Sequence, residues 1–587
     1  MKKPLFVLAA GFLVCAVSLA QALTPGGATV RGSVFWDQNQ NGARDAGEPG
    51  LPGVCVSNGH EVVQTGGDGS YQLPAYNEMA LFVIKPSGYA APLDERNIPQ
   101  FFYLHQPDGS PAQIHEYPGL DPTGPLPAAV DFPLEKSPEP DSFRAVIMGD
   151  TQVYTDREIE YLRNSIVREA AMEEAALVVA MGDNVGDRLS LYPRYLEVMK
   201  GIGKPLYLVP GNHDMNLDAE DPEHAFETFK REFGPPYYAF NYGKVHFVVL
   251  NSVVYPSPLY SNAGEKHIHG EIGAAQMAWL ANDLRHVPAD HLIVLNMHIP
   301  LVSFIDRAAP SQQVANRQAL YDLLEGRQVV ALGGHTHTLE HYLAGDEEEG
   351  WGQPTPIDQI IVGAACGSWW AGDLDASGVP MAYQRLGAPR GYMLFSFQGG
   401  TYETLYKAAG QPVEKQMHMA FKTRSFDDWY GRLWDWANQP QSARPPHPPV
   451  TPKDLPDQGR ISQAELTTTP LVANVWNGTR DSVVMCRYDD GPAVAAVQDR
   501  EIGDPHVLRL QAYSWRYAEG FELFNGATYG PAPPQPLDPW MHVRMSTHIW
   551  RCALPGDLAP GSHRATVSTT DQYGNTFQES MAFEVTE

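Results

Sequence analysis

Residues 143–152 read FRAVIMGDTQ, an apolar run that ends in Asp150 and Gln152. A continuous apolar run of this length is typical of a strand that is buried on both faces. The same design, a buried strand followed at once by polar residues, recurs in ALVVAMGDN (176–184), LYLVPGNHD (206–214), LIVLNMH (292–298) and VVALGGHTH (329–337). These five stretches decide the fold that we predict.

Segments with helical periodicity lie between these strands, at residues 155–174 and 270–287. Buried strands that alternate with helices predict an α/β domain, because the helices cover both faces of the sheet. We place this domain at residues 141–410.

The flanks of the chain are predicted to be rich in β-structure. Residues 23–137 contain short alternating strands separated by Gly, Pro and Asn turns, and residues 411–587 return to this character around a Pro-rich linker at 439–460. A chain of 587 residues also exceeds what one core usually holds. The predicted fold class is multidomain, with a central α/β domain between an N-terminal β-sandwich and a C-terminal β-rich domain.

The first residues, MKKPLFVLAAGFLVCAVSLAQA, have the pattern of a secretory signal peptide over residues 1–22 with cleavage near Ala22. Cys15 leaves a lipoprotein as an alternative, although Val14 precedes it where a small residue is preferred. The other apolar runs are too short to span a bilayer. We therefore expect a periplasmic or secreted protein without a stable membrane anchor.

The formal net charge is −28. This charge argues against nucleic acid or anionic lipid as a general partner, since both would repel the protein. Acidity that keeps an exported protein soluble explains the charge without a partner. The oligomeric state stays open.

Export permits disulfides, and four cysteines remain after removal of the first 22 residues. Cys486 and Cys552 lie in β-like segments of the C-terminal region, and we expect them to pair. Cys55 and Cys366 fall in different predicted domains and are expected to be buried thiols.

Residues 37–48, DQNQNGARDAGE, match the spacing of an EF-hand calcium loop. A strand precedes this loop and PGLPG follows it, so the flanks do not fit an EF-hand. The stretch resembles the calcium loop of prealbumin-like and B-type β-sandwich repeats on bacterial surface proteins. We predict a structural calcium site there, and an Asn- and Gly-rich turn without calcium is the alternative. The candidate ligands are Asp37, Asn39, Asn41, Asp45 and Glu48.

Polar residues gather where the central strands end, and ligands of open α/β sheets bind outside the carboxyl ends of strands. In extended backbone, residues i and i+2 face the same way, so Asp150 can converge with Gln152 and His335 with His337. In chain order, Asp-x-Gln, GDN, GNHD, MH and GHTH resemble the signature of the calcineurin-like metallophosphoesterase superfamily. The resemblance implies a two-sheet sandwich flanked by helices.

The resemblance also implies a centre of two divalent metal ions, of which Mn, Fe, Zn and Mg are the candidates. Asp183 would bridge the two ions. The first ion would also bind Asp150, Gln152 and His337, and the second would bind Asn212, His298 and His335.

Family membership further implies hydrolysis of a phosphate ester by a hydroxide that lies between the metals. His213 would stabilise the charged transition state or protonate the leaving oxygen. Either Asp214 or Asp187 would orient its imidazole, and Asp187 stands one residue later than the corresponding residue of the protein phosphatases.

Gln152 departs from the family pattern, in which histidine occupies this position. Its amide oxygen can reach a metal, but it is a neutral donor and softer metals prefer imidazole. We expect a weaker first site, or one that favours Mn²⁺, Mg²⁺ or Ca²⁺ over Zn²⁺. Two alternatives are that Gln152 only binds a metal-bound water and that the site is an inactive relic.

Residues 363–410 look like the distal part of an exported bacterial subgroup with a prealbumin-like N-terminal domain and a β-rich C-terminal domain. Trp369 and Trp370 are candidates for a wall of the substrate site. Asp373 and Asp375 would bind hydroxyls or a cation, and Arg390 would meet a phosphate oxygen. Packing and loop solvation are the alternative for all five residues.

The leading hypothesis is an exported dinuclear-metal phosphoesterase that hydrolyses a small phosphate monoester or diester, or a component of the cell envelope. The motifs do not separate monoesters from diesters, and we favour a monoester or small diester over a phosphoprotein. The alternative is a surface protein that binds envelope or glycan through calcium-stabilised β domains, with the central domain as a scaffold.

Overall fold

The computed structural model describes residues 27–112, 116–259, 266–346, 351, 357–437, 439–440, 442–443, 445, 448–514 and 545–587. The expected signal peptide at residues 1–22 lies outside the described residues. Within the ranges given above, no helix combines the length and the apolar character that crossing a bilayer requires.

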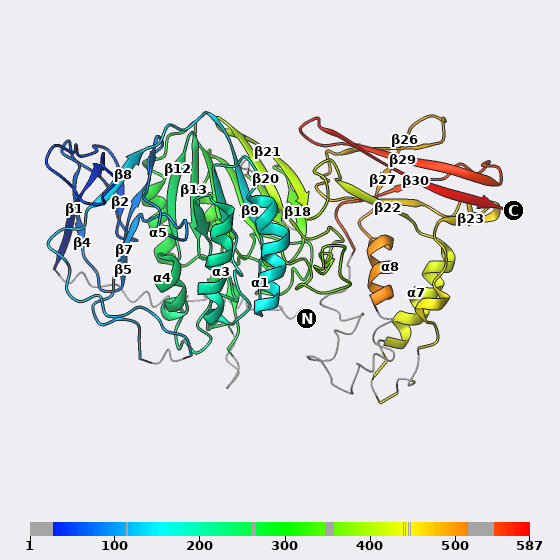
Figure 1. The fold of residues 1–587 in the computed structure, drawn as a ribbon, viewed down its shortest axis with the longest axis horizontal. Helices are drawn as coiled ribbons and strands as arrows, with labels where there is room; N and C mark the ends of the chain where they lie inside the picture. The colour runs from blue at the N-terminus through cyan, green and yellow to red at the C-terminus, as the bar shows by residue number, and fades with distance from the viewer. Residues whose placement is uncertain are drawn as a thin grey trace, which may run out of the picture.

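The N-terminal part of the chain forms two four-stranded sheets, as predicted for a β-sandwich (Figure 1). Their cores hold fully buried Val34 and Val56. The first sheet has the order β4 (Ser70–Pro74), β1 (Thr29–Trp36), β8 (Phe132–Lys136) and β6 (Tyr89–Ala90). The second has the order β3 (Val62–Gln64), β2 (Cys55–Ser57), β5 (Met79–Ile84) and β7 (Phe102–His105).

Two further sheets form the central part of the chain. The five-stranded sheet has the order β11 (Leu206–Leu208), β10 (Leu177–Ala180), β9 (Ser142–Met148), β20 (Gly391–Gln398) and β21 (Thr401–Ala408). The six-stranded sheet has the order β12 (Tyr238–Tyr242), β13 (Val245–Leu250), β16 (Leu292–Met297), β17 (Gln328–Gly333), β19 (Ile357–Val362) and β18 (Leu339–Tyr342). A short hairpin pairs β14 (Val253–Val254) with β15 (His269–Gly270).

The two central sheets pack face to face. Neighbouring side chains along β9 show this, because they lie alternately in two different hydrophobic cores. Ile147 of β9 lies in one core with Phe247 and Leu295 of the other sheet. Its neighbour Val146 points to the opposite face, where it packs with Ile159. Neighbouring side chains of a strand point to opposite faces, so β9 is covered by a sheet on one side and by helices on the other.

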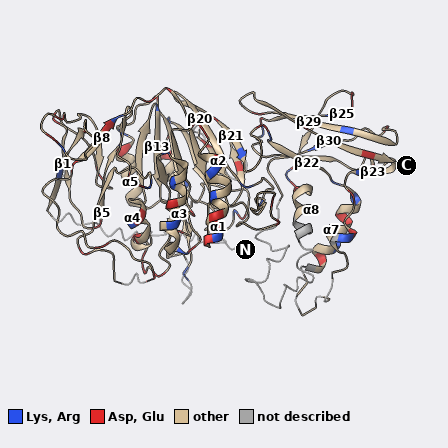
Figure 2. Cartoon of the chain, in the orientation of Figure 1, with Lys and Arg blue, Asp and Glu red and all other residues tan. Residues whose placement is uncertain are grey.

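The helices cover the outer faces of the two central sheets. Figure 2 shows charged residues of both signs on α1, α3 and α4, while the central strands are almost free of them, as expected for helices with one buried face. The α-helices of the central part are α1 (Asp156–Leu162), α2 (Arg168–Ala170), α3 (Tyr192–Met199), α4 (Glu227–Phe233), α5 (Ala274–Asp283) and α6 (Arg317–Leu323). The π-helical turn Arg163–Val167 joins α1 to α2, and 3₁₀ turns lie at Leu189–Leu191, Lys200–Ile202 and Pro222–His224.

Both predicted helices are shorter than their sequence patterns. The first begins where Thr155 and Glu158 form a capping box, and its helical path ends at Ala170. The second begins at Ala274 and not at residue 270, because Gly270 is already paired in β15. Tertiary pairing thus overrides the periodicity at the start of α5.

The C-terminal part of the chain forms two more sheets beside the central ones (Figure 1). One has the order β22 (Met417–Phe421), β24 (Leu471–Val475), β28 (Ile549–Cys552) and β27 (Val497–Gln498). The other has the order β23 (Arg460–Ser462), β30 (Thr576–Thr586), β29 (Gly561–Thr570), β25 (Val483–Tyr488) and β26 (Val494–Ala495). The helical segments here are α7 (Arg424–Ala437), α8 (Pro505–Ser514) and the 3₁₀ turns Pro452–Asp454 and Gln463–Glu465.

The predicted disulfide between Cys486 and Cys552 is present and joins β25 to β28, and therefore the two C-terminal sheets. Cys366 is a buried free thiol, as expected, and Cys55 is a free thiol that is only half-buried. The C-terminal sheets also contact the central part, where the Asn477 Oδ1 atom lies 2.7 Å from His341 Nε2.

Candidate metal centre

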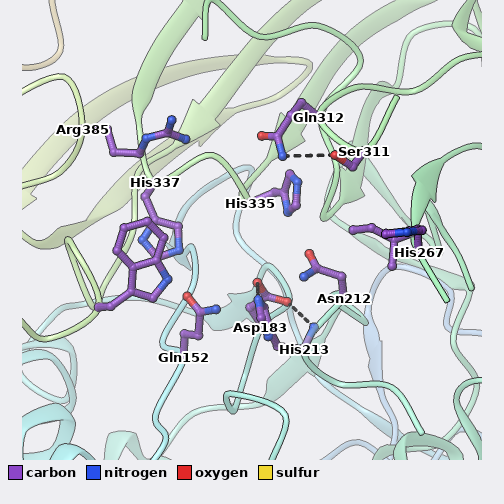
Figure 3. A pocket seen from close by; sticks show the side chains of 12 residues that line it. Gln152, Asp183, Asn212, His213, His267, Ser311, Gln312, His335, His337 and Arg385 are labelled. Atoms are coloured by element: carbon purple, nitrogen blue, oxygen red, sulfur yellow. Dashed lines mark hydrogen bonds and ion pairs between the residues drawn. The ribbon is translucent and has the colours of Figure 1, made fainter. Parts of the chain in front are cut away.

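The predicted metal ligands all follow parallel strands that end at the same edge of the two central sheets. Strands β9, β10 and β11 are parallel to one another, as are β16 and β17. Their ends therefore bring together side chains that lie far apart in the sequence. Figure 3 shows the labelled residues Gln152, Asp183, Asn212, His335 and His337 around one pocket.

Asp183 lies at the centre of the predicted ligand set. Its Oδ2 atom is 3.1 Å from His298 Nε2, which is also 3.1 Å from Asn212 Oδ1. Ligand atoms of Asp183, His298 and His335 lie within 4.8 Å of one another. This spacing fits a single cation bound between them.

Two ligands predicted for the first metal site, Asp150 and His337, also lie close together. Asp150 Oδ1 is 3.6 Å from His337 Nε2, and both side chains are buried. The backbone N–H of His335 donates to both carboxylate oxygens of Asp150 at 3.0 Å. These bonds hold the Asp150 carboxylate in one orientation toward the site.

Three histidines present an Nε2 atom to the ligand cluster. His298 Nδ1 lies 2.9 Å from the Met181 carbonyl oxygen, and His337 Nδ1 lies 2.6 Å from that of Gly367. A carbonyl accepts only a proton, so each bond places the proton on Nδ1 and leaves Nε2 as the electron-pair donor. His335 Nε2 is buried and makes no hydrogen bond within the described ranges. The donor set of carboxylate, imidazole and amide oxygen therefore fits divalent cations.

Gln152 faces the same pocket. Its Nε2 atom donates to the Tyr154 hydroxyl at 3.1 Å, which leaves Oε1 as the atom available to a metal or to a bound water. The Cys366 sulfur lies 4.0 Å from this oxygen. This geometry permits both direct ligation and a water-mediated contact.

The turns that carry the ligands have unusual backbone. Five predicted ligands have positive φ: Asp150 at 31°, Gln152 at 32°, Asp183 at 48°, His335 at 71° and His337 at 53°. Left-handed backbone is costly for residues other than glycine, and it concentrates at functional sites. Alternation along the sequence predicts extended backbone at these residues, and the turns depart from that prediction.

One neighbouring glycine permits a close approach of two of these turns. A Cβ atom at Gly211 would stand 2.0 Å from the backbone nitrogen of Asp183. Only glycine therefore allows the turn after β11 to pack directly on the central aspartate.

Burial and neighbouring charges divide the titrating groups of the site into two classes. From the protein groups alone, burial lowers the pKa of His335 and of His337 to about 3, so both imidazoles are neutral. Burial also raises the pKa of Asp150 to about 8. Burial opposes ionisation of Asp183 too, but His298 and His213 outweigh burial and lower the pKa of this carboxyl. Burial disfavours the charged form of His298 as well, but Asp183 outweighs it and raises the pKa of His298 to about 9, so in the protein alone His298 Nε2 carries a proton that a bound cation would displace.

His213 stands at the edge of the ligand cluster. Its Nε2 atom is 4.0 Å from Asp183 Oδ2, and its Nδ1 atom is 2.7 Å from Asp187 Oδ1. Burial disfavours the charged imidazole, but Asp183 and Asp187 outweigh burial and raise the pKa of His213 to about 9. From the protein groups alone, His213 is therefore protonated at neutral pH, and its side chain lines the pocket.

The structure assigns the orienting carboxylate to Asp187 and corrects the assignment to Asp214. Asp214 is fully buried and accepts hydrogen bonds from Gly211 N at 2.9 Å, Asn184 Nδ2 at 3.0 Å and the Tyr192 hydroxyl at 3.0 Å. Its carboxylate thus ties two ligand-bearing turns together, and no hydrogen bond or ion pair between it and the His213 ring is found in the described structure.

Only one of the two predicted wall tryptophans reaches the pocket, which has a volume of about 310 Å³. The Trp369 ring stacks on His337, with ring centroids 4.3 Å apart and planes inclined by 25°. Trp370 is buried, and its indole N–H donates to the Thr151 carbonyl at 3.0 Å. Trp370 supports the turn between Asp150 and Gln152 and does not line the pocket.

The predicted phosphate contact by Arg390 is also corrected. Arg390 is buried outside the pocket, where it pairs with Asp375 at 2.6 Å and donates to the Met381 carbonyl at 3.3 Å. Asp373 is half-buried, and the residues that line the pocket include neither Asp373 nor Asp375. Packing, the alternative for this segment, holds for Arg390 and Asp375.

Five pocket residues lie outside the set predicted from the sequence. They belong to no motif, and no pattern in the sequence could have identified them without the fold. They are His267, Ile268, Ser311, Gln312 and Arg385.

The predicted calcium loop closes through its own hydrogen bonds. Asp45 Oδ2 accepts from the side chains of Asn39 and Asn41 at 2.8 Å, and Asp37 accepts from the backbone of Gly42 at 2.7 Å. The two oxygens of Glu48 accept backbone N–H groups at 2.8 and 2.9 Å. Calcium at this loop stays a prediction.

Three models of one protein family match successive parts of the chain. The match to "N terminal of Calcineurin-like phosphoesterase" covers residues 38–117, that to "Calcineurin-like phosphoesterase" covers 143–339, and that to "C terminal of Calcineurin-like phosphoesterase" covers 360–577. Purple acid phosphatase 15 of Arabidopsis thaliana is 29% identical over 151 residues, which are 23% of this chain. The match spans 25% of the length of that relative.

Solved structures show weaker likeness. Purple acid phosphatase PPD1 from yellow lupin (Lupinus luteus) has a TM-score of 0.32 at 13% identity, over 61% of this chain and 67% of that one. A dimetal phosphatase from Danio rerio has a TM-score of 0.29 at 14% identity, over 45% of this chain and 98% of that one. PhoD has a TM-score of 0.33 at 15% identity, over 60% of this chain and 79% of that one.

The two facing sheets and the buried cluster at their shared edge fit the metallophosphoesterase class. The three family models agree with this class and extend it to both flanking parts of the chain. The protein belongs to the calcineurin-like phosphoesterase family.

Proposed function

We propose that this protein is a dinuclear-metal phosphoesterase that hydrolyses a small phosphate monoester or diester. One observation carries the proposal. Ligand atoms of Asp183, His298 and His335 lie within 4.8 Å of one another, and Asp150 lies 3.6 Å from His337 at the same edge of the sheets.

Each side of Asp183 would hold one divalent cation. Asp150, Gln152 and His337 would bind the first ion and Asn212, His298 and His335 the second, with Asp183 shared. Two bound cations would neutralise charge on the phosphate and make water a strong nucleophile near neutral pH.

The chain's own contribution to bond cleavage centres on His213. Asp187 holds the imidazole through Nδ1, so Nε2 faces the pocket with a proton. A proton at this atom can be transferred to the leaving oxygen of the ester, and its positive charge stabilises the developing negative charge.

Gln152 would shape the metal preference. An amide oxygen in place of an imidazole favours Mn²⁺ or Mg²⁺ over Zn²⁺ at the first site. Water-mediated binding by Gln152 is the alternative, and it would weaken the first site further.

The pocket volume of about 310 Å³ supports a small substrate or a small part of an envelope component. The N-terminal residues 1–22 support export to the periplasm or beyond. Binding of envelope or glycan by the flanking β domains rests only on their β-rich architecture and is the weaker proposal.

The test measures hydrolysis of 4-nitrophenyl phosphate and bis(4-nitrophenyl) phosphate by the chelated protein after addition of Mn²⁺, Mg²⁺, Zn²⁺ or Ca²⁺. Asp183→Asn should abolish turnover. Asp428→Asn, a carboxylate on α7 whose side chain is 72% exposed, should leave turnover unchanged. A folded protein that cleaves neither ester with any of the four metals would contradict the proposal.

A further inference from the structure

Arg385 lines the pocket although it belongs to no metallophosphoesterase motif. Its side chain is 4% exposed, so the guanidinium is held inside the protein and is not a mobile surface group. In Figure 3, Arg385 lies beyond His337, on the opposite side of the pocket from Asp183 and His213. Arg385 and His213 both line this pocket.

Arg385 is attached to the turn that carries two predicted metal ligands. Its backbone N–H donates to the His337 carbonyl at 3.0 Å, and its Nη1 atom donates to the Thr336 carbonyl at 3.3 Å. Its Nη2 atom pairs with Asp306 at 2.6 Å. These contacts hold the guanidinium in place at the wall of the pocket.

The C-terminal part of the chain also supports the Arg385 loop. The side-chain N–H of Asn474, on β24, donates to the Leu386 carbonyl at 3.1 Å and to Asp504 Oδ2 at 2.6 Å. The Asn474 Oδ1 atom lies 2.6 Å from His548 Nδ1, and His418 pairs with Asp504. Asn474, Asp504 and His548 are each 1% exposed, so this network is part of the interior.

The contact between this network and the loop leaves no spare room. Gly387 has a φ of 92°, and a Cβ atom there would lie 2.6 Å from Asn474 Nδ2 and 3.0 Å from Asp504 Cβ. The loop therefore rests directly on Asn474 and Asp504, and movement of either residue would shift the residues next to Gly387.

We propose that Arg385 binds a phosphate oxygen of the substrate and that Asn474 is a positioning residue, which holds the Arg385 loop through Leu386. This inference rests on the proposed phosphoesterase function and narrows its substrate. The phosphate of a monoester is a dianion and that of a diester a monoanion, so the monoester gains more from the positive charge of Arg385. A residue of the C-terminal sheets then helps to position a substrate-binding side chain of the active site.

The test compares wild-type protein, Arg385→Lys and Asn474→Ala, each loaded with Mn²⁺ and checked for metal content. Two quantities are measured: kcat and KM for 4-nitrophenyl phosphate, and the Kd of inorganic phosphate by calorimetry. Arg385→Lys should raise both KM and the phosphate Kd about 10- to 100-fold, since a charge-assisted hydrogen bond to the phosphate is lost. Asn474→Ala should raise both in the same direction by a smaller factor, with unchanged metal content.

Arg390→Lys is the matched control, because Arg390 is a buried, ion-paired arginine of the same segment that does not line the pocket. It should lower the melting temperature and leave the phosphate Kd within about twofold of wild type. Asp306→Asn tests a purely structural role for Arg385, since it breaks the ion pair and keeps the guanidinium. If that pair were the whole role, Asp306→Asn and Arg385→Lys would lower the melting temperature alike and neither would change the phosphate Kd.

The inference is overturned if the wild-type protein hydrolyses esters while Arg385→Lys and a second variant, Arg385→Gln, both keep the wild-type phosphate Kd. The role of Asn474 is overturned if Asn474→Ala changes only the melting temperature. A wild-type protein without turnover on either ester would instead contradict the proposed function, so the two failures are distinguishable.

Discussion

Asp187→Asn separates the two roles that His213 can have in ester cleavage. The Asp187 carboxylate lies 2.7 Å from His213 Nδ1, and asparagine keeps its size while removing its charge. Asp183 still faces the imidazole from 4.0 Å. The variant therefore lowers the pKa of His213 from its value of about 9 and loosens the ring without removing it.

The expected loss is moderate and depends on the leaving group. Asp187 is 43% exposed, so the ion pair contributes only about 0.2–1 kcal/mol to folding and the variant should remain folded. Full removal of a general acid costs about 10²- to 10⁴-fold in rate, which we expect for His213→Ala on an alkyl phosphate. Asp187→Asn should lose about 10-fold on that ester, since it keeps the acid but weakens it.

The assay measures kcat for an alkyl phosphate and for 4-nitrophenyl phosphate in the wild-type protein and both variants. An alkoxide needs a proton to leave and 4-nitrophenolate does not, so the losses should be much smaller for the nitrophenyl ester. The alkaline limb of the pH–rate profile should also move to lower pH in Asp187→Asn, because a histidine with a lower pKa loses its proton earlier as pH rises. Asp290→Asn breaks another exposed ion pair, with Lys244, and should change neither quantity.

Equal losses on the two esters would refute proton donation by His213 and leave it a role in charge stabilisation alone. No loss on either ester in His213→Ala would refute both roles.

Three further predictions concern the metal site and the frame around it. Gln152→His should tighten Zn²⁺ binding at the first site, measured by competition with a chelator, and unchanged Zn²⁺ affinity would favour the water-mediated role of Gln152. Gly211→Ala should lower the free energy of unfolding by about 3 kcal/mol or more and lower the metal content, because the new Cβ would lie 2.0 Å from backbone. Gly67→Ala is the control and should change stability little, since nothing lies within 4 Å of its Cβ position. Similar melting temperatures for the two variants would contradict this prediction. Replacing Cys486 and Cys552 by serine should cost about 4 kcal/mol of unfolding free energy in urea, as expected for a link across 66 residues, and a loss below about 1 kcal/mol would contradict the estimate.

The strands and their polar ends could be predicted from sequence because both signals are local. Residues 145–148 are apolar on both faces of their strand, and the ligand positions follow within a few residues of each strand end. Parallel pairing then places the strand ends at one edge, so convergence of the ligands required no knowledge of side-chain contacts.

Contacts between loops could not be predicted in this way. Asp187 and Asp214 are both within a few residues of a ligand, but only the fold shows that Asp214 is enclosed by backbone donors while Asp187 faces His213. Arg385 and Arg390 lie five residues apart in one segment, and the structure turns one into the pocket and the other toward Asp375. Which residue of each pair faces the site depends on tertiary packing, and tertiary packing produces no periodic pattern in the sequence.

The backbone at position 152 is held in place, so its metal preference depends on the donor atom of the side chain and not on how far that side chain reaches. The Gln152 N–H donates to the Asp183 carbonyl at 2.8 Å, and its φ of 32° is set by the turn between two strand ends. The Trp370 indole holds the preceding carbonyl, that of Thr151, at 3.0 Å. These bonds hold the backbone of Gln152 whatever side chain it carries, so an imidazole there would start from the same Cα as the amide. A difference in metal preference between Gln152 and Gln152→His would then report the donor atom itself, oxygen against nitrogen, and a difference in folding would show that the turn depends on the side chain after all.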